Sequence, residues 1–272
     1  MKKKLHYPVL SRFDLVFFRL GGPGLGNLLF PVCRAFLAWK KDGGVFIYPT
    51  WRQLKIGPYL RGEVDKRSYG NLFRKRTFLD WLNLIKAKVS SLFLLNSVVP
   101  FEVIKYTGLG NYFHDFSDSR YEILSFINQI MRGEASDSRS DICIHVRTGD
   151  FIKTPDFDQG GHSIQSERSW YITATRFAIS NWDLENPKIT IFSDGCVNDI
   201  KSQLENYGVV RVDQSENALE ALLHMSRCEI LIGSRSTFSG WASYLSDAIT
   251  IWPKGFHFQR FSPERVGKDF SI

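Results

Sequence analysis

The second half of the chain carries the most regular pattern of hydrophobic and polar positions. Short apolar runs bounded by turn residues alternate with longer segments whose apolar residues recur at helical spacing. Continuous apolar strands separated by helices are typical of a parallel sheet with helices on both faces, so this half is predicted to be α/β. Strands are expected at 141–147, 188–193, 209–212, 229–233 and 248–252, and helices at 170–180, 197–207, 218–227 and 237–245.

A shorter pattern of the same kind occurs near the N-terminus. The apolar run 15–20 is predicted to be a buried strand that ends at the glycine-rich turn 21–27. Apolar residues recur at helical spacing from 28 to 41, a glycine pair then favours a helix end, and 45–48 is apolar again. This order predicts one strand–helix–strand unit. Residues 50–120 show no clean alternation, although 78–95 is expected to form one or two helices.

Charge and linker composition divide the chain into two halves. Residues 1–136 contain 21 Lys and Arg against 10 Asp and Glu, whereas the remainder contains 14 against 18. The Ser- and Asp-rich tract 136–141 is typical of a linker or turn. We therefore expect two domains, 1–136 and 137–272. The first is basic enough to face an anionic partner, although a solvated basic surface explains the same charge.

Composition excludes several classes of protein. With 43% hydrophobic residues the chain is not intrinsically disordered, and no segment has the uncharged apolar length of a membrane span. The basic N-terminus lacks the following apolar region of a secretion signal. The four cysteines form no Cys-x-x-Cys pair, so zinc and thioredoxin-like sites are unsupported. We expect them to be small buried hydrophobes in a cytoplasmic protein.

Chemistry-bearing residues follow the predicted strands, where parallel sheets bind their ligands. The turn that contains Gly24, Gly26 and Asn27 lets backbone amides approach a bound group at the start of a helix. It matches neither the dinucleotide-binding fingerprint nor a P-loop, and a tight packing turn explains it equally well.

Two further strand ends carry polar groups suited to an anion. His145 and Arg147 project from the same face of a strand, and an Arg fork suits phosphate oxygens, although an Arg147–Asp150 ion pair is the alternative. The turn 234–239 brings hydroxyls and free helix amides together, either as an anion cradle or as plain helix capping. Asp194 can cap the next helix or accept hydrogen bonds from a sugar or base. This set suits a nucleotide diphosphate held without a lysine cradle.

Four of these segments resemble the motifs of a known enzyme family. Gly24-Leu25-Gly26-Asn27-Leu28-Leu29-Phe30, His145-Val146-Arg147-Thr148-Gly149-Asp150, Phe192-Ser193-Asp194 and Ser236-Thr237-Phe238-Ser239-Gly240-Trp241-Ala242 are similar, in order, to motifs of the α-1,2-fucosyltransferases of glycosyltransferase family 11. The resemblance implies a GT-B architecture, two Rossmann-like domains whose parallel sheets face a cleft. It also implies an inverting, metal-independent transfer from GDP-fucose to a glycan hydroxyl.

The resemblance assigns roles to single residues. Arg147 would hold the donor β-phosphate, and Ser236, Thr237 and Phe238 would contact the diphosphate. His145 and Asp194 would lie near the nucleoside, and Asn27, beside Gly24 and Gly26, near the diphosphate or sugar. Thr148 departs from the pattern, because many members carry a second Arg there, so donor sugars other than fucose stay open.

A carboxylate could take the proton of the acceptor hydroxyl late in the reaction. Asp150, Asp156 and Asp158 are the candidates, and the resemblance favours Asp156. No metal or cofactor besides the GDP-fucose co-substrate is expected. Asp156-Phe157-Asp158 also matches the Asp-x-Asp of metal-dependent GT-A enzymes, but it lacks a preceding apolar strand.

The expected partners are a nucleotide sugar and a glycan acceptor, with an α-1,2 linkage formed in surface polysaccharide or O-antigen synthesis. The cationic, aromatic-bearing segment 73–95 predicts docking on an anionic membrane at the inner face of the plasma membrane, where lipid-linked glycans would be presented. A core helix with a solvated basic edge is the alternative. A net charge of +7 with Arg74-Lys75-Arg76 also suits a nucleic-acid-binding protein. However, no RRM, KH or zinc signature is present, so we do not expect the protein to bind nucleic acid.

Overall fold

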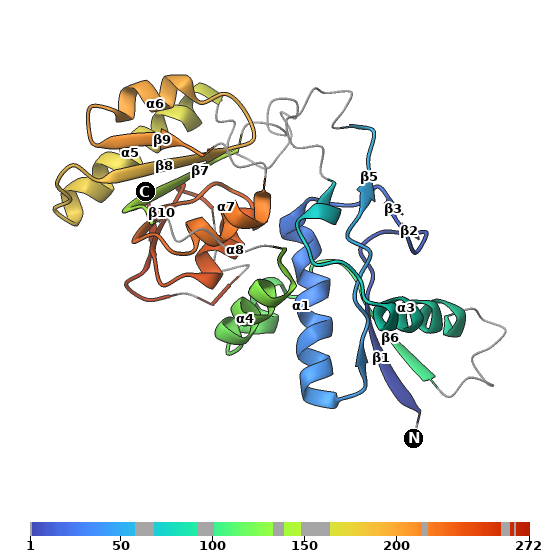
Figure 1. The fold of residues 1–272 in the computed structure, drawn as a ribbon. Helices are drawn as coiled ribbons and strands as arrows, with labels where there is room; N and C mark the ends of the chain where they lie inside the picture. Colours follow the sequence, from blue (N-terminus) through green and yellow to red (C-terminus); the bar gives the residue numbers. More distant parts are fainter. Residues whose placement is uncertain are drawn as a thin grey trace. The chain divides into compact units, whose positions relative to one another are not determined.

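The computed structural model describes residues 2–57, 68–91, 101–132, 139–147, 164–213, 217–256, 262–263 and 265–272. Contacts divide the chain into two compact units, and the main division falls between Gly133 and Glu134 (Figure 1). Each unit contains a parallel sheet flanked by helices, which confirms the predicted α/β fold class. None of the helices in the described part of the chain has the length and apolar content to cross a membrane.

The second unit is built on a six-stranded parallel sheet. Its strand order is β12-β11-β10-β7-β8-β9. The chain therefore moves outward from β7 through β8 to β9, returns to the other side of β7, and moves outward again through β10, β11 and β12. The point between β7 and β10 is thus a topological switch point, where open α/β sheets bind their ligands. The strands are β7 (Ile142–Val146), β8 (Lys188–Ser193), β9 (Val209–Val212), β10 (Ile230–Ile232), β11 (Ile249–Trp252) and β12 (Asp269–Ser271).

The hydrophobic pattern predicted this unit closely. Strands 188–193 and 209–212 and helix 237–245 are confirmed at their predicted bounds, and most of the other elements differ from prediction by a few residues. The isoleucines of β7, β8, β10 and β11 pack together with Ala174 and Ala178 of the covering helix α5, which explains their continuous apolar runs. β12 was missed because a three-residue edge strand has no apolar run. The helices are α5 (Ile164–Asn181), α6 (Asn198–Leu204), α7 (Ala218–Met225) and α8 (Thr237–Leu245).

The first unit contains a three-stranded parallel sheet in the order β4-β1-β6. Leu84 and Ala87 of α3 pack against Leu5 and Tyr7 of β1 on one face, and α1 covers the other face (Figure 1). The strands are β1 (Lys3–Pro8), β4 (Val45–Phe46) and β6 (Phe101–Tyr106). The helices are α1 (Leu25–Asp42), α3 (Phe78–Ser90) and α4 (Arg120–Ile130), with two short 3₁₀ helices, η1 (Tyr69–Asn71) and η2 (Tyr112–Phe116).

The prediction of a strand over 15–20 was wrong for residues 15–18, and only 19–20 form a strand. Val16 has a φ of 73°, which no strand residue adopts, and Leu15 and Phe17 are exposed. Residues 15–18 instead form the loop between two short strands, β2 (Phe13–Asp14) and β3 (Arg19–Leu20). The strand that precedes α1 in the parallel sheet is β1, whose buried Leu5 and Tyr7 alternate with lysines and histidine in a way that the basic N-terminus concealed.

A second, small sheet buries its polar face and exposes its apolar face. β3 pairs with β2 on one side and with β5 (Gln53–Leu54) on the other. The register aligns Asp14, Arg19 and Gln53 on the face turned into the protein. Phe13, Leu20 and Leu54 align on the opposite face, where all three are exposed.

Candidate functional site

The carboxyl ends of three neighbouring strands meet beside the switch point of the second unit. Val146 at the end of β7 pairs with Ser193 at the end of β8, and Ile144 pairs with Ile232 at the end of β10. Arg147, Asp194 and the turn that begins at Gly233 therefore leave the same edge of the sheet. His145 lies one residue before the end of β7 and is buried, although the sequence predicted that it projects together with Arg147.

His145 is joined to the turn between β10 and α8 by two hydrogen bonds. Its Nδ1 lies 2.6 Å from Ser239 Oγ and 3.0 Å from Ser234 Oγ. The ring centroid of Phe238 lies 5.3 Å from that of His145. A ring nitrogen of an imidazole is either donor or acceptor, and a hydroxyl can complement both states. The contacts therefore fix the ring between the strand and the first turn of α8.

The serines of this turn form a buried cluster of their own. Ser234 N donates to Ser239 Oγ at 2.9 Å, and the Ser234 and Ser236 hydroxyls lie 3.0 Å apart. Ser236 is the N-cap of α8, because its Oγ accepts from Ser239 N at 3.2 Å. Helix capping, the simpler of the two sequence interpretations, is thus present at Ser236. The cluster also fixes where α8 begins relative to the edge of the sheet.

Burial keeps the His145 ring neutral at pH 7. Burial lowers the pKa of His145 to about 4, the carboxylate of Asp194 opposes this change, and the guanidinium of Arg147 adds to it. The three groups are thus close enough to interact electrostatically. His145 is consequently a neutral hydrogen-bonding group here, and Arg147 supplies the positive charge.

The remaining predicted residues of this edge stand closer to solvent. Arg147, Thr237 and Phe238 are half-buried and Asp194 is exposed. Because α8 begins at Thr237, its first amides point out of the helix end at the edge where Arg147 leaves β7. A guanidinium and a helix N-terminus at one strand edge make an electropositive position suited to a phosphate.

Arg235, in the turn between β10 and α8, is a second cation near this edge and was not among the predicted site residues. Its Nη2 donates to the carbonyl of Lys254 at 3.1 Å, which holds the half-buried side chain beside the start of α8. Its place between Ser234 and Ser236 in the hydroxyl-rich turn 234–239 was the available signal. The preceding Gly233 lies against Trp252, since a Cβ there would lie 2.5 Å from an atom of the indole ring.

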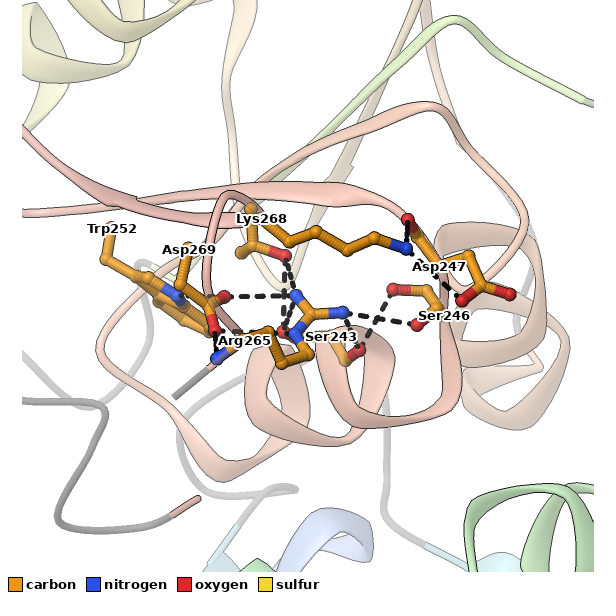
Figure 2. A network of polar contacts seen from close by, with 8 residues as sticks. Ser243, Ser246, Asp247, Trp252, Arg265, Lys268 and Asp269 are labelled. Carbon is orange, nitrogen blue, oxygen red and sulfur yellow. Dashed lines mark hydrogen bonds and ion pairs between the residues drawn. The ribbon is translucent and has the colours of Figure 1, made fainter. Parts of the chain in front are cut away.

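The far end of α8 is held by an ion-pair network centred on Arg265 (Figure 2). Arg265 Nη1 donates to the carbonyls of Ser243 and Ser246 at 3.0 and 3.1 Å, and Nη2 donates to Asp269 Oδ1 at 3.0 Å. Nη2 also donates to Ser243 Oγ and Thr250 Oγ1, each at 2.8 Å. Arginine therefore satisfies the last carbonyls of the helix whose first turn forms the site.

The glycine-rich turn of the first unit leads directly into α1. Gly24 is the N-cap of α1 and has no capping side chain, while Gly26 and Asn27 belong to the first helical turn rather than to the preceding loop. The amide of Leu25 donates to the hydroxyl of Tyr69 at 3.1 Å. The turn is thus the start of a long helix, as the sequence predicted, with its glycines on both sides of the helix boundary.

Two buried polar residues beneath this turn were missed by the sequence analysis. Arg19 donates through Nε to Thr50 O at 3.1 Å and through Nη1 to Gly21 O at 2.9 Å. Arg19 Nη2 and both amide atoms of Gln53 are buried and have no hydrogen-bond partner within the described residues. Such atoms are costly in a native protein, so each of them calls for a polar partner such as water. Arg19 was missed because it lay within an apparent apolar strand.

Several predicted residues lie outside the described part of the chain. These are Thr148 and the three carboxylates Asp150, Asp156 and Asp158. Among the described residues, no group of three His, Cys, Asp or Glu side chains is placed to hold a metal ion. Cys33, Cys143 and Cys228 are buried, as expected, whereas Cys196 is exposed.

The sequence of residues 80–265, more than half of the chain, matches the family model of glycosyl transferase family 11. The chain belongs to this family. It is therefore a glycosyltransferase, and the family resemblance drawn from the four motifs is confirmed. No curated protein matches the chain in sequence.

Solved structures resemble this family 11 glycosyltransferase at low sequence identity. The NodZ α-1,6-fucosyltransferase soaked with GDP-fucose is 13% identical, with a TM-score of 0.48 over 90% of this chain and 93% of that chain. The fucosyltransferase NodZ from Bradyrhizobium is 12% identical, with a TM-score of 0.47 over 90% and 94%. POFUT1 in complex with GDP is 10% identical, with a TM-score of 0.41 over 92% and 74%.

Proposed function

We propose that this glycosyltransferase transfers fucose from GDP-fucose to a hydroxyl of a glycan acceptor, with inversion and without a metal ion, forming an α-1,2 linkage. The observation that carries the proposal is the position of Arg147 and the first turn of α8 on the two sides of the β7–β10 switch point. The resemblance of the four motifs to those of α-1,2-fucosyltransferases supports the choice of fucose and of the α-1,2 linkage.

In the proposed reaction the acceptor oxygen forms a bond to the anomeric carbon of fucose. The bond from that carbon to the β-phosphate oxygen breaks, and its electron pair leaves with GDP. Charge therefore develops on the diphosphate, where Arg147 and the amides of Thr237 and Phe238 would stabilise it. The hydroxyl of Ser236 is already engaged as the N-cap, so we assign it to fixing these amides rather than to direct contact.

The guanosine is assigned to the strand edge beside the diphosphate. Neutral His145 is held by Ser234 and Ser239, and exposed Asp194 at the next strand end can accept hydrogen bonds from a ribose or base. Gly24, Gly26 and Asn27 would approach the diphosphate or sugar from the first unit. This assignment makes 137–272 the donor domain and 1–136 the acceptor-side domain of a GT-B enzyme.

A carboxylate completes the reaction by taking the acceptor proton. Asp156 is our assignment for this base, with Asp150 as the alternative, because the family motif places a carboxylate a few residues beyond the Arg. Thr148 stands where many family members carry a second Arg, so this chain has one cation fewer at that position. Arg235 would replace that positive charge from the neighbouring turn, where its side chain is already held by Lys254.

The acceptor we propose is a lipid-linked glycan of surface polysaccharide or O-antigen synthesis, modified by a cytoplasmic enzyme at the inner face of the plasma membrane. The basic first half supports this choice, because lipid-linked glycans are presented at an anionic surface.

Ligand-induced thermal stabilisation tests the donor directly, since a ligand that binds only the native state raises the melting temperature. GDP and GDP-fucose are expected to stabilise the protein in EDTA, and GDP-mannose and UDP-sugars to do so less. Stabilisation by UDP-sugars with manganese, and not by guanine nucleotides, would replace this donor with another nucleotide sugar. A gel shift with DNA or RNA at physiological salt is expected to show no retention.

A further inference from the structure

Helix α3 presents apolar side chains on two opposite faces. Leu84 and Ala87 are buried against the sheet of the first unit. Phe78, Leu82, Ile85 and Val89 lie at spacings of four, three and four residues on the other side, and all are exposed, Phe78 by 78%. One apolar stripe is enough to attach a helix to its protein. The outer stripe is therefore not explained by packing within the described chain.

The loop between β2 and β3 extends this exposed apolar surface. Phe13, Leu15 and Phe17 are exposed, Phe17 by 70%. The Phe17 ring lies 4.8 Å from the Trp81 ring of α3 between centroids, so the loop and the helix are in contact, and Figure 1 shows β2 and α3 in the same part of the first unit. We call these seven residues, Phe13, Leu15, Phe17, Phe78, Leu82, Ile85 and Val89, the outer apolar surface.

The exposed loop is held in place by buried polar contacts. The Asp14 carboxylate accepts hydrogen bonds from Tyr7 Oη at 3.0 Å, from Thr50 Oγ1 at 2.8 Å and from Val16 N at 2.9 Å. Lys88 Nζ of α3 lies 3.6 Å from the same carboxylate. Because the polar side chains of the loop are anchored inward, its aromatic and aliphatic side chains point outward. The buried contacts of Asp14 thus hold the apolar side chains of the loop in their exposed positions.

The charge surrounding the outer apolar surface is positive. The flanking segments 12–20, 52–55 and 74–88 contain eight Lys and Arg besides the buried Arg19, but only two acids, Asp14 and Asp80. Asp14 pairs with Lys88, and Asp80 pairs with Arg74 at 2.7 Å. Arg12, Lys75 and Lys86 are exposed at its margin. Phenylalanines and leucines with a margin of lysines and arginines complement an anionic lipid surface.

We propose that α3 and the β2–β3 loop dock this protein on an anionic lipid bilayer. α3 would lie along the interface with its outer stripe in the acyl boundary, and the three marginal cations would face the headgroups. The proposal extends the sequence-based expectation for 73–95 by adding a second segment, the loop that carries Phe13, Leu15 and Phe17. It does not depend on the proposed donor, because vesicle binding is measured without nucleotide or transfer.

Co-sedimentation of the full chain with vesicles tests the proposal. Binding to phosphatidylglycerol vesicles is expected at low salt, to weaken as salt is added, and to be absent on phosphatidylcholine. Replacing Phe78, Leu82 and Ile85 by Ser should decrease partition by at least about tenfold, since their apolar area would no longer be buried in lipid. The matched control replaces Tyr121 and Val209 by Ser, two exposed hydrophobic residues elsewhere, and should bind like the wild type.

A charge variant tests the cationic margin separately. Lys75→Gln with Lys86→Gln should decrease partition by about 30-fold, which corresponds to about 1 kcal/mol for each charge. Lys41→Gln with Lys188→Gln removes two exposed lysines outside the surface and should have little effect. Absence of binding at low salt, or equal binding to both vesicle types, would overturn the proposal. Self-association in lipid-free sedimentation that the Phe78 triple variant abolishes would assign the surface to a second copy instead.

Discussion

His145 Nδ1 and Ser239 Oγ lie 2.6 Å apart, although 94 positions of sequence separate them. The contact joins the end of β7 to the first turn of α8 across the switch point of the sheet. Both residues are buried, and Ser234 Oγ, 3.0 Å from His145 Nδ1 and 3.1 Å from Ser239 Oγ, completes the cluster. The pair therefore fixes the distance between the two elements to which we assign the diphosphate.

Acid should destabilise the protein through His145. Its pKa is lowered to about 4 in the folded chain, so between that value and the ordinary 6.5 the unfolded chain binds a proton that the folded chain does not. The stabilisation is complete above pH 6.5 and is lost as pH falls toward 4, by at most about 3 kcal/mol. The free energy of unfolding, measured with urea between pH 4 and 6.5, should depend less on pH in His145→Gln than in the wild type. His6 and His224 are shared by both proteins, so parallel curves would exclude His145 as the source.

Arg147→Ala should decrease the transfer rate by about 100- to 1,000-fold, or about 3–4 kcal/mol, because a charge-assisted contact to the leaving phosphate is lost. Circular dichroism should remain native. Arg139→Ala, which removes an exposed arginine at the opposite end of β7, is the control and should retain activity. A decrease of less than about tenfold in Arg147→Ala would mean that Arg147 does not stabilise the leaving group.

Asp156→Asn should slow turnover while leaving GDP-fucose binding unchanged, because a general base acts on the acceptor and not on the donor. Asp158→Asn, two residues away, tests another candidate base in the same assay. Single-turnover rates and thermal shifts with donor separate the two effects. If Asp150→Asn alone loses turnover, the base is Asp150.

Two adjacent glycines should differ in their tolerance of a methyl group. Both have positive φ, 63° at Gly21 and 125° at Gly22, but a Cβ meets no atom within 4 Å at Gly21 and lies 2.3 Å from Arg19 Nη1 at Gly22. Gly21→Ala should cost about 1 kcal/mol of folding free energy and Gly22→Ala about 3 kcal/mol or more. Urea denaturation measures both. Equal losses of folding free energy in the two variants would show that the Arg19 side chain moves aside without destabilising the turn.

Arg265→Met should destabilise the second unit by about 3 kcal/mol, since it leaves the buried Asp269 carboxylate and the last carbonyls of α8 unpaired. Lys268→Met is the control within the same network, because its pair with Asp247 is exposed and worth little. Thermal unfolding compares the two variants. A similar melting temperature for both variants would show that the Arg265 network does not stabilise α8.

Local sequence pattern determined the elements of the second unit and several of its site residues. The apolar runs of β7, β8 and β10 are visible in sequence because strands buried on both faces need no polar alternation. The Ser236 cap and the turn after β10 follow from residue types whose preferences are local. The motif resemblance identified the family from the same short segments.

Tertiary structure decided what those segments meet. The order β12-β11-β10-β7-β8-β9 depends on pairing between strands far apart in the chain, and only that order brings His145 to Ser239. The loop 15–18 was mistaken for part of a strand because apolar residues usually signal burial, whereas here Asp14, Arg19 and Gln53 take the buried face and Leu15 and Phe17 are exposed. Which face of a short sheet turns inward depends on the partners available to its polar side chains. Those partners, Tyr7 and Thr50 among them, come from other parts of the chain, so local pattern does not contain the answer.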